Sequence, residues 1–110
     1  MKIKELMPLI EAQNDAPGAD LEREVLCGYT CDLLSWVMGR AREGDCWITI
    51  MSNRNVAAVA QLTDCALVIL SEGVRPDPDA LEAFKTRGMN LLGSRADTFS
   101  LCRAVGELLA

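Results

Sequence analysis

The sequence has 110 residues, half of them hydrophobic and a quarter charged, which is typical of one globular domain over residues 1–110. It contains no histidine, which excludes His-based acid–base catalysis, His-activated nucleophiles and His metal ligands. The net charge of −5 has the wrong sign for a protein that follows nucleic-acid phosphates or for a polybasic membrane anchor.

Strand-like and helix-like segments alternate along the chain, and turn or capping residues separate them. In chain order the expected elements are a helix over residues 1–9, an extended piece over 9–12, a turn over 14–18, a strand over 24–30, a helix over 33–38, a strand over 46–51, a helix over 56–62, a strand over 65–70, a helix over 79–87, a strand over 89–92 and a helix over 99–109. This alternation is typical of an α/β fold. We therefore expect a mixed or mostly parallel central sheet with helices on both faces.

Several residues indicate where these elements begin and end. We expect the first strand to fray at Gly28 and Asp32 to cap the helix that follows. Asp77 with Pro78 is a typical helix start, and Asp97 has the same role for the last helix. The helix over 56–62 is almost entirely apolar, so we expect it to be covered on more than one side.

The five cysteines show no C-x-x-C spacing, and most lie inside apolar stretches. This pattern favours small buried hydrophobic residues in a reducing compartment over a metal or redox site. No run approaches the roughly 18 apolar residues of a membrane span, and the N-terminal residues do not resemble a secretory signal. We expect a cytoplasmic protein with no metal, no cofactor, no nucleic-acid partner and no membrane partner.

The known phosphate-binding signatures are absent. No glycine-rich loop precedes any of the three lysines, as a phosphate-binding loop requires, and no G-x-G-x-x-G frame is present. The sequence therefore predicts neither a kinase nor a dinucleotide-binding enzyme. An enzyme that uses Cys31 or Asp32 in a catalytic pair is the weakest of the alternatives.

Three expected loops follow strands and lead into helices, at residues 52–55, 71–73 and 93–98. Ligands of parallel α/β sheets bind outside the carboxyl ends of the strands, where helix N-termini favour anions. Two of these loops carry an arginine, Arg54 or Arg95, which would suit a phosphate or a carboxylate. Helix capping and turn formation are the alternative explanation for the other polar residues there.

A resemblance to a known family rests on the runs LEREVLCGYTCDLLSWVM at 21–38, EGDCWITI at 43–50 and NVAAVA at 55–60, with Asp97-Thr98-Phe99 before the last helix. In this order and spacing they resemble the DRTGG-domain family, especially its stand-alone bacterial members, often named serine kinases. Where related proteins place Gly-Gly after a strand, this chain has Ser71-Glu72-Gly73.

The resemblance implies an α/β domain similar to the N-terminal domain of HPr kinase/phosphorylase, which lacks the catalytic half and its phosphate-binding loop. Such domains resemble regulatory modules, and stand-alone members are often encoded near iron-only hydrogenase and redox genes. The resemblance and the strand-end loops together select the candidate ligand-binding residues. These are Gly28, Asp32, Ser35, Ser52, Asn53, Arg54, Asn55, Arg95, Asp97 and Thr98.

Two functions remain open. The first is a non-catalytic regulatory module that binds a small anionic ligand or nucleotide and acts as a homodimer, which would cover the apolar helix. The alternative is an interaction or assembly subunit for a larger redox enzyme system, such as a hydrogenase. In that case Trp36 and Met38, beside Tyr29, would be the anchors at the interface.

Overall fold

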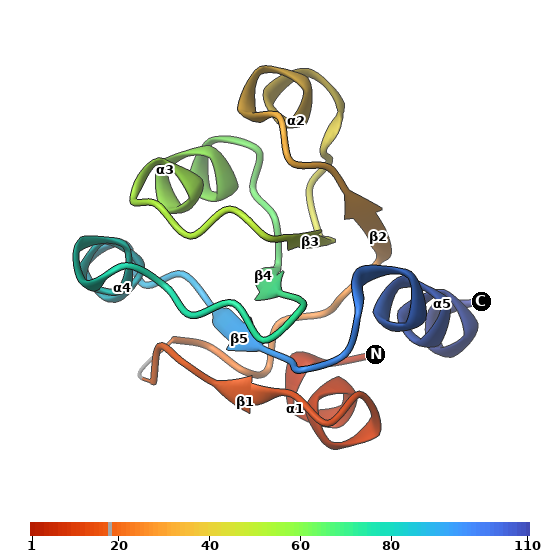
Figure 1. Cartoon of the computed structure of the whole chain (residues 1–110). Coiled ribbons are helices and arrows are strands. Elements are labelled where there is room, and N and C mark those ends of the chain that lie inside the picture. The colour runs from red at the N-terminus through yellow and green to blue at the C-terminus, as the bar shows by residue number, and fades with distance from the viewer. Residues whose placement is uncertain (18) are drawn as a thin grey trace.

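A five-stranded sheet forms the centre of the computed structural model, which describes residues 1–17 and 19–110 (Figure 1). The strands are β1 (Gln13–Asn14), β2 (Cys27–Thr30), β3 (Asp45–Thr49), β4 (Leu67–Leu70) and β5 (Leu91–Gly93), in the spatial order β1-β5-β4-β3-β2. The last four strands are parallel, and β1 pairs antiparallel with β5. The predicted α/β class with a mixed, mostly parallel sheet is confirmed.

Helices cover both faces of this sheet. They are α1 (Ile3–Leu6), the 3₁₀ helix η1 (Met7–Leu9), α2 (Leu34–Arg40), α3 (Asn55–Leu62), α4 (Pro78–Arg87) and α5 (Thr98–Leu109). The connecting helices α2, α3 and α4 lie side by side on one face, and α1 and α5 lie on the other (Figure 1). The chain therefore crosses from one face of the sheet to the other after β5, at the start of α5.

The core divides into two layers because successive residues of a strand point to opposite faces. Trp47, Val68 and Leu91 pack with the buried residues of α3 and α4, whereas Ile48 and Ile69 face α5. The strands β3 and β4 are buried along their whole length, as their continuous apolar runs predict.

The first strand and the helix after it differ from the expectation. Gly28 does not fray the strand but lies inside β2, where it pairs with Cys46. Asp32 does not cap α2, whose N-cap is Leu33 without a side-chain bond. The carboxylate of Asp32 instead accepts hydrogen bonds from Thr49 Oγ1 at 2.7 Å and from the Ile50 amide at 3.1 Å. The prediction was wrong because a distant hydroxyl competes for the same carboxylate.

The N-terminal region also contains an element that sequence patterns did not indicate. The strand β1 begins at Gln13, inside the region expected to be an extended piece and a turn. The last residue of that expected turn, Gly18, lies outside the described residues. The predicted starts of α4 and α5 at Asp77 and Asp97 are confirmed.

The apolar helix α3 is covered by its own chain. Val56, Ala57, Val59 and Ala60 are all buried, and α3 packs against α2 and α4. A second copy is therefore not needed to cover this helix, and the argument for a homodimer that was based on it was wrong.

The cysteines divide into two groups. Cys46 and Cys65 are buried, as expected, and burial raises the pKa of both thiols, which makes them poor nucleophiles. Cys31 and Cys102 are partly exposed and Cys27 is exposed, so the expectation was wrong for Cys27. Within residues 1–17 and 19–110, no group of three or more Cys, Asp or Glu side chains could hold a metal ion. No helix among these residues is long and apolar enough to cross a membrane.

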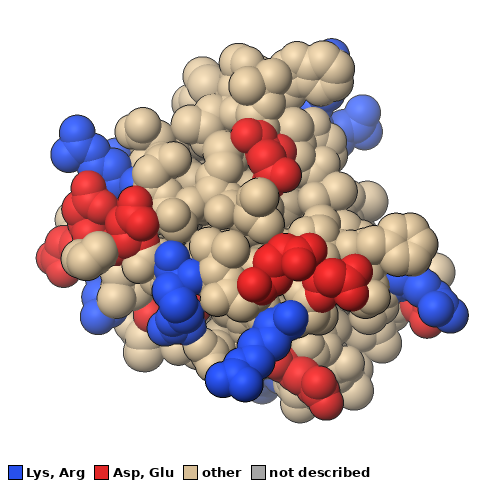
Figure 2. Space-filling model, in the orientation of Figure 1, with Lys and Arg blue, Asp and Glu red and all other residues tan. Residues whose placement is uncertain are grey.

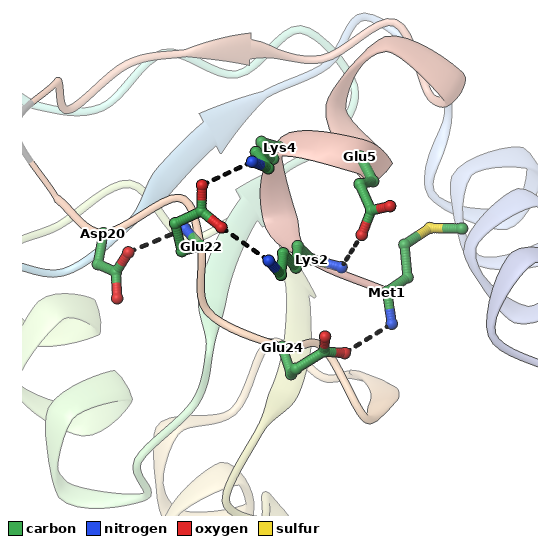
Figure 3. Close-up of polar contacts among 7 residues, drawn as sticks. All are labelled: Met1, Lys2, Lys4, Glu5, Asp20, Glu22 and Glu24. Atoms are coloured by element: carbon green, nitrogen blue, oxygen red, sulfur yellow. Dashed lines mark hydrogen bonds and ion pairs between the residues drawn. The ribbon is translucent and has the colours of Figure 1, made fainter.

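Ion pairs fasten the N-terminal helix to the segment that leads into β2 (Figure 3). Lys2 and Lys4 both donate to the carboxylate of Glu22, at 2.9 and 2.6 Å, and the Met1 amino group donates to Glu24 at 2.8 Å. Hydrogen bonds from Lys4 and then Lys2 lower the pKa of Glu22 from 4.5 to about 2. This cluster places three cations and two carboxylates on one exposed surface.

We expect Glu22→Gln to lower the thermal unfolding temperature at neutral pH by a small amount, because the pair is solvent-exposed. A carboxyl group whose pKa is lower in the folded state than in the unfolded state stabilises the fold when the pH is above its unfolded-state pKa. This stabilisation is lost as the pH falls through the folded-state pKa. The difference from wild type should therefore shrink as the pH falls from 4.5 to about 2. Thermal scans across this range measure it, with Glu82→Gln, an exposed acid on α4, as the control variant.

Candidate functional site

The chain leaves the sheet in opposite directions after β4 and β5. The loop after β4 leads to α4 on one face, and the loop after β5 leads to α5 on the other (Figure 1). Such a divergence opens a crevice at the carboxyl ends of neighbouring strands, which is the usual ligand position in open α/β sheets. The topology therefore indicates a site between these two loops.

A tight turn shapes the loop after β4. Glu72 and Gly73 have φ values of 62° and 71°, and the Val74 amide donates to the Ser71 carbonyl at 3.1 Å. Two successive positive φ values are the signature of a type I′ turn, in which glycine is favoured.

The two loops are joined to each other by hydrogen bonds. The Glu72 amide donates to the Ala96 carbonyl at 2.8 Å, and the Gly73 amide donates to the Ser94 carbonyl at 2.9 Å. The Ser71 and Thr98 hydroxyls lie 2.7 Å apart. Because these two amides are already paired within the protein, they are not free to bind an anion.

A cleft of about 690 Å³ opens beside the joined loops. The residues that line it are Glu11, Gln13, Gly73, Val74, Arg75, Gly93, Ser94, Arg95 and Ala96. Gln13 comes from β1, whose antiparallel pairing sets it beside Gly93. The volume lies within the roughly 300–1,000 Å³ range of small-molecule sites.

Two arginines give the cleft its positive charge. Arg75 is mostly exposed and donates one hydrogen bond, at 2.9 Å, to the carboxylate of Asp15. Arg95 is exposed and forms no ion pair with another described residue. A guanidinium has five N–H donors, so both side chains keep donors for an anion. Figure 2 shows basic side chains next to acidic ones on this face, so the positive charge is local.

Gly93 allows the carboxylate of Asp15 to approach the end of β5. A Cβ atom at this position would lie 2.5 Å from Asp15 Oδ2 and 3.6 Å from Arg75 Nη1. The side chain of Asp15 is only 4% exposed, so it has little room to move. The absence of a side chain at Gly93 therefore helps to hold Arg75 at the cleft.

Replacing Gly93 by alanine should displace Asp15 and Arg75, because β5 itself is held by β4 and β1. We expect a loss of about 1–3 kcal/mol in the free energy of unfolding, as in other overpacked sites, together with weaker binding of any anion that the cleft takes. Urea unfolding and calorimetric titration measure the two effects. Gly39→Ala is the control, since a Cβ there meets nothing within 4 Å; equal behaviour of the two variants would contradict this account.

The residues predicted at the start of α5 have structural roles. Asp97 accepts hydrogen bonds from the hydroxyl and the amide of Ser100, which lower its pKa. The Thr98 amide donates to the carboxylate of Glu72 at 2.7 Å. The first turn of α5 is thus already bonded to two protein carboxylates. Of the residues predicted in this loop, Arg95 alone lines the cleft.

The residues predicted after β3 do not line this cleft. Ser52 Oγ donates to Asp77 at 3.1 Å, and Asn53 Oδ1 accepts from the Asn55 amide at 2.9 Å. The Asn53–Asn55 bond is a turn contact, as the alternative explanation for this loop proposed, and the Ser52–Asp77 bond joins this loop to the start of α4. Arg54 is exposed at the start of α3 and does not line the cleft.

Of the other three predicted residues, Asp32 bonds to Thr49 and Ile50, and Gly28 and Ser35 lie in β2 and α2. None of the three lines the cleft. Gly28 lines an apolar groove of about 340 Å³ between β2 and α5. Ser35 is exposed in the first turn of α2. The structure therefore does not gather the predicted residues into one site, and their role in ligand binding stays a prediction.

Sequence reasoning missed Arg75 and Gln13 as lining residues. Arg75 follows a buried strand and precedes a helix start. The rule that ligands lie at the ends of parallel strands would have included it if the loop had been taken to extend beyond Gly73. Gln13 gave no signal, because β1 is two residues long and is defined by its pairing with β5.

The sequence matches none of the protein-family models and none of the curated proteins with which it was compared. The structure is similar to the crystal structure of the CBS and DRTGG domains of the regulatory region of Clostridium perfringens pyrophosphatase, complexed with its activator diadenosine tetraphosphate. The TM-score is 0.75 and the identity 16%, over 94% of this chain and 45% of that chain. The predicted resemblance to DRTGG-domain proteins is confirmed at the level of the fold.

Proposed function

We propose that this chain is a non-catalytic regulatory module that binds a small anion of the phosphate or nucleotide class in the cleft between the β4 and β5 loops. The observation that carries the proposal is the pair of arginines, Arg75 and Arg95, in a cleft at the point where the chain changes face. Guanidinium groups bind phosphate by charge-assisted, often bidentate, hydrogen bonds.

The fold comparison supports a regulatory role. The similar structure is a regulatory region complexed with a nucleotide activator, and this chain corresponds to 45% of it. That activator is bound by a region that holds two kinds of domain. The support for an anion site in this chain therefore comes from its own Arg75 and Arg95.

Isothermal titration of the purified chain with inorganic phosphate, nucleoside monophosphates and diadenosine tetraphosphate tests the proposal. We expect saturable binding of at least one phosphate-containing compound, weakened by added salt because the contacts are ionic. The same ligand should raise the unfolding temperature, as linkage requires. If no phosphate compound binds or stabilises the chain, the proposed function is wrong.

We further propose that the chain acts as a homodimer through the edge formed by β2 and α2. Among the described residues, no strand pairs with β2 on its outer side, and Leu33, Trp36 and Met38 are about half exposed beside it. Between residues 26 and 38 the only charged side chain is Asp32, which bonds internally to Thr49. The Arg40 guanidinium also lies over the Trp36 ring, 3.7 Å from its centroid, so the surface carries few charges rather than none. A surface with few charges can meet a second copy of itself with little like-charge repulsion, although the net charge of the chain is −5.

Light scattering after size-exclusion chromatography should therefore give the mass of a dimer, and Trp36→Asp should give a monomer, because a charge at an apolar interface is costly to bury. The matched control is Phe99→Asp, which changes an even more exposed aromatic residue on α5. A wild-type chain that stays monomeric at high concentration contradicts the homodimer. The same surface would then fit the alternative, docking on a larger redox enzyme.

A further inference from the structure

The two edges of the sheet differ in how they are protected from pairing with a further strand. At one edge β1 is only two residues long, and the charged residues Glu11 and Asp15 flank it. At the other edge β2 has four residues, and residues 26–31 include neither a charged residue nor a proline. Very short strands, charges and prolines are usual means of preventing edge-to-edge pairing. The β2 edge lacks the charges and the prolines.

The backbone of β2 is paired with a neighbouring strand on one side. Residues 27–30 pair with residues 45–48 of β3. Among the described residues no strand pairs with the other side, and Figure 1 shows β2 at the edge of the sheet, between α2 and α5. An edge strand presents a row of N–H and C=O groups to any strand that approaches it. The outer side of β2 can therefore accept one more strand.

Apolar surface flanks this edge on both faces of the sheet. On one face lie the half-exposed side chains of Leu33, Trp36 and Met38. On the other face lies the groove of about 340 Å³ between β2 and α5, and none of the residues that line it has a charged side chain. Three side chains near α2 are a small part of the roughly 20–30 residues that each partner contributes to a standard interface. The strand and the groove together would extend that interface.

We propose that β2 pairs antiparallel with β2 of a second copy of this chain, so that two five-stranded sheets join into one continuous sheet. This inference rests on the proposed homodimer and adds main-chain hydrogen bonds to its interface. Identical strands related by a two-fold axis perpendicular to the sheet run antiparallel, and the same axis sets α2 towards α2 and groove towards groove. A second copy fits because the strand has no charged side chain that would repel its own counterpart.

Hydrogen exchange of the β2 backbone amides tests the inference, measured by NMR at chain concentrations above and below the dissociation constant of the dimer. The amides that face away from β3 should exchange at least about tenfold more slowly in the dimer, because they then donate to the second copy. If light scattering gives the mass of a dimer while every β2 amide exchanges equally in both states, the strand pairing is wrong and the homodimer stands. If the chain is monomeric at high concentration, the proposed homodimer itself is wrong.

Two substitutions of Cys27, an exposed residue of β2, form a matched pair for the same test. Cys27→Lys sets a positive charge from each copy at the paired strands, so it should shift the mass to that of a monomer. Cys27→Ser also removes the thiol but keeps the strand uncharged, so it should remain a dimer. Circular dichroism checks that both variants fold. A folded Cys27→Lys variant that dimerises as tightly as wild type overturns the strand pairing.

Discussion

Replacing Arg75 and Arg95 together by alanine is expected to abolish phosphate or nucleotide binding. A hydrogen bond to a charged group contributes about 1.5–3 kcal/mol, so each single substitution should weaken binding roughly 10-fold to 100-fold. Each arginine comes from a different loop, and the loops are joined by backbone bonds between Glu72 and Ala96. The pair therefore places two guanidinium groups at one cleft. Calorimetric titration measures the loss.

The matched control for this experiment is Arg54→Ala. Arg54 is also an exposed arginine after a parallel strand, but it does not line the cleft. Its loss should leave the affinity nearly unchanged apart from the general effect of one surface charge. If Arg54→Ala weakens binding as much as Arg75→Ala does, the site lies after β3, and the assignment to the β4 and β5 loops is wrong.

Phe84→Ala is expected to cause the largest loss of stability among the substitutions considered. Phe84 is 2% exposed on α4 and packs into the core layer that contains Trp47 and Leu91. Removing a buried phenylalanine side chain costs about 3–5 kcal/mol through lost burial and the cavity that remains. Because a domain of this size is stable by only about 5–15 kcal/mol, much of the folded population should be lost at modest urea concentrations.

Phe99→Ala makes the same chemical change at a side chain that is 79% exposed. It should shift the urea midpoint little, because few apolar contacts are lost. Comparable losses for Phe84→Ala and Phe99→Ala would mean that α4 does not pack on the sheet as described.

The parallel part of the fold could be predicted from the sequence because its signals are local and agree with one another. The apolar runs that form β3 and β4 are long and continuous, and Gly88 ends α4 in the left-handed conformation expected of a helix C-cap. The strand β1 could not be predicted, since its two residues are held by pairing with β5 far along the chain.

The site was only partly predictable, because it too depends on contacts between segments that are far apart in the sequence. Arg95 follows from the rule that ligands lie at the carboxyl ends of parallel strands. The rule does not say which strand end opens a cleft, because that depends on where the chain changes face, here after β5. The role of Asp15 could not be read from sequence either, since its partner Arg75 lies 60 residues away.

The central claim is that an anion binds between the loops after β4 and β5, and an amide-resolved NMR titration with adenosine monophosphate tests it most directly. The account predicts saturable shifts at residues 73–75 and 93–96 and at Gln13, which also lines the cleft. Shifts confined to residues 53–55, or to the groove between β2 and α5, or none at saturating ligand, would contradict it.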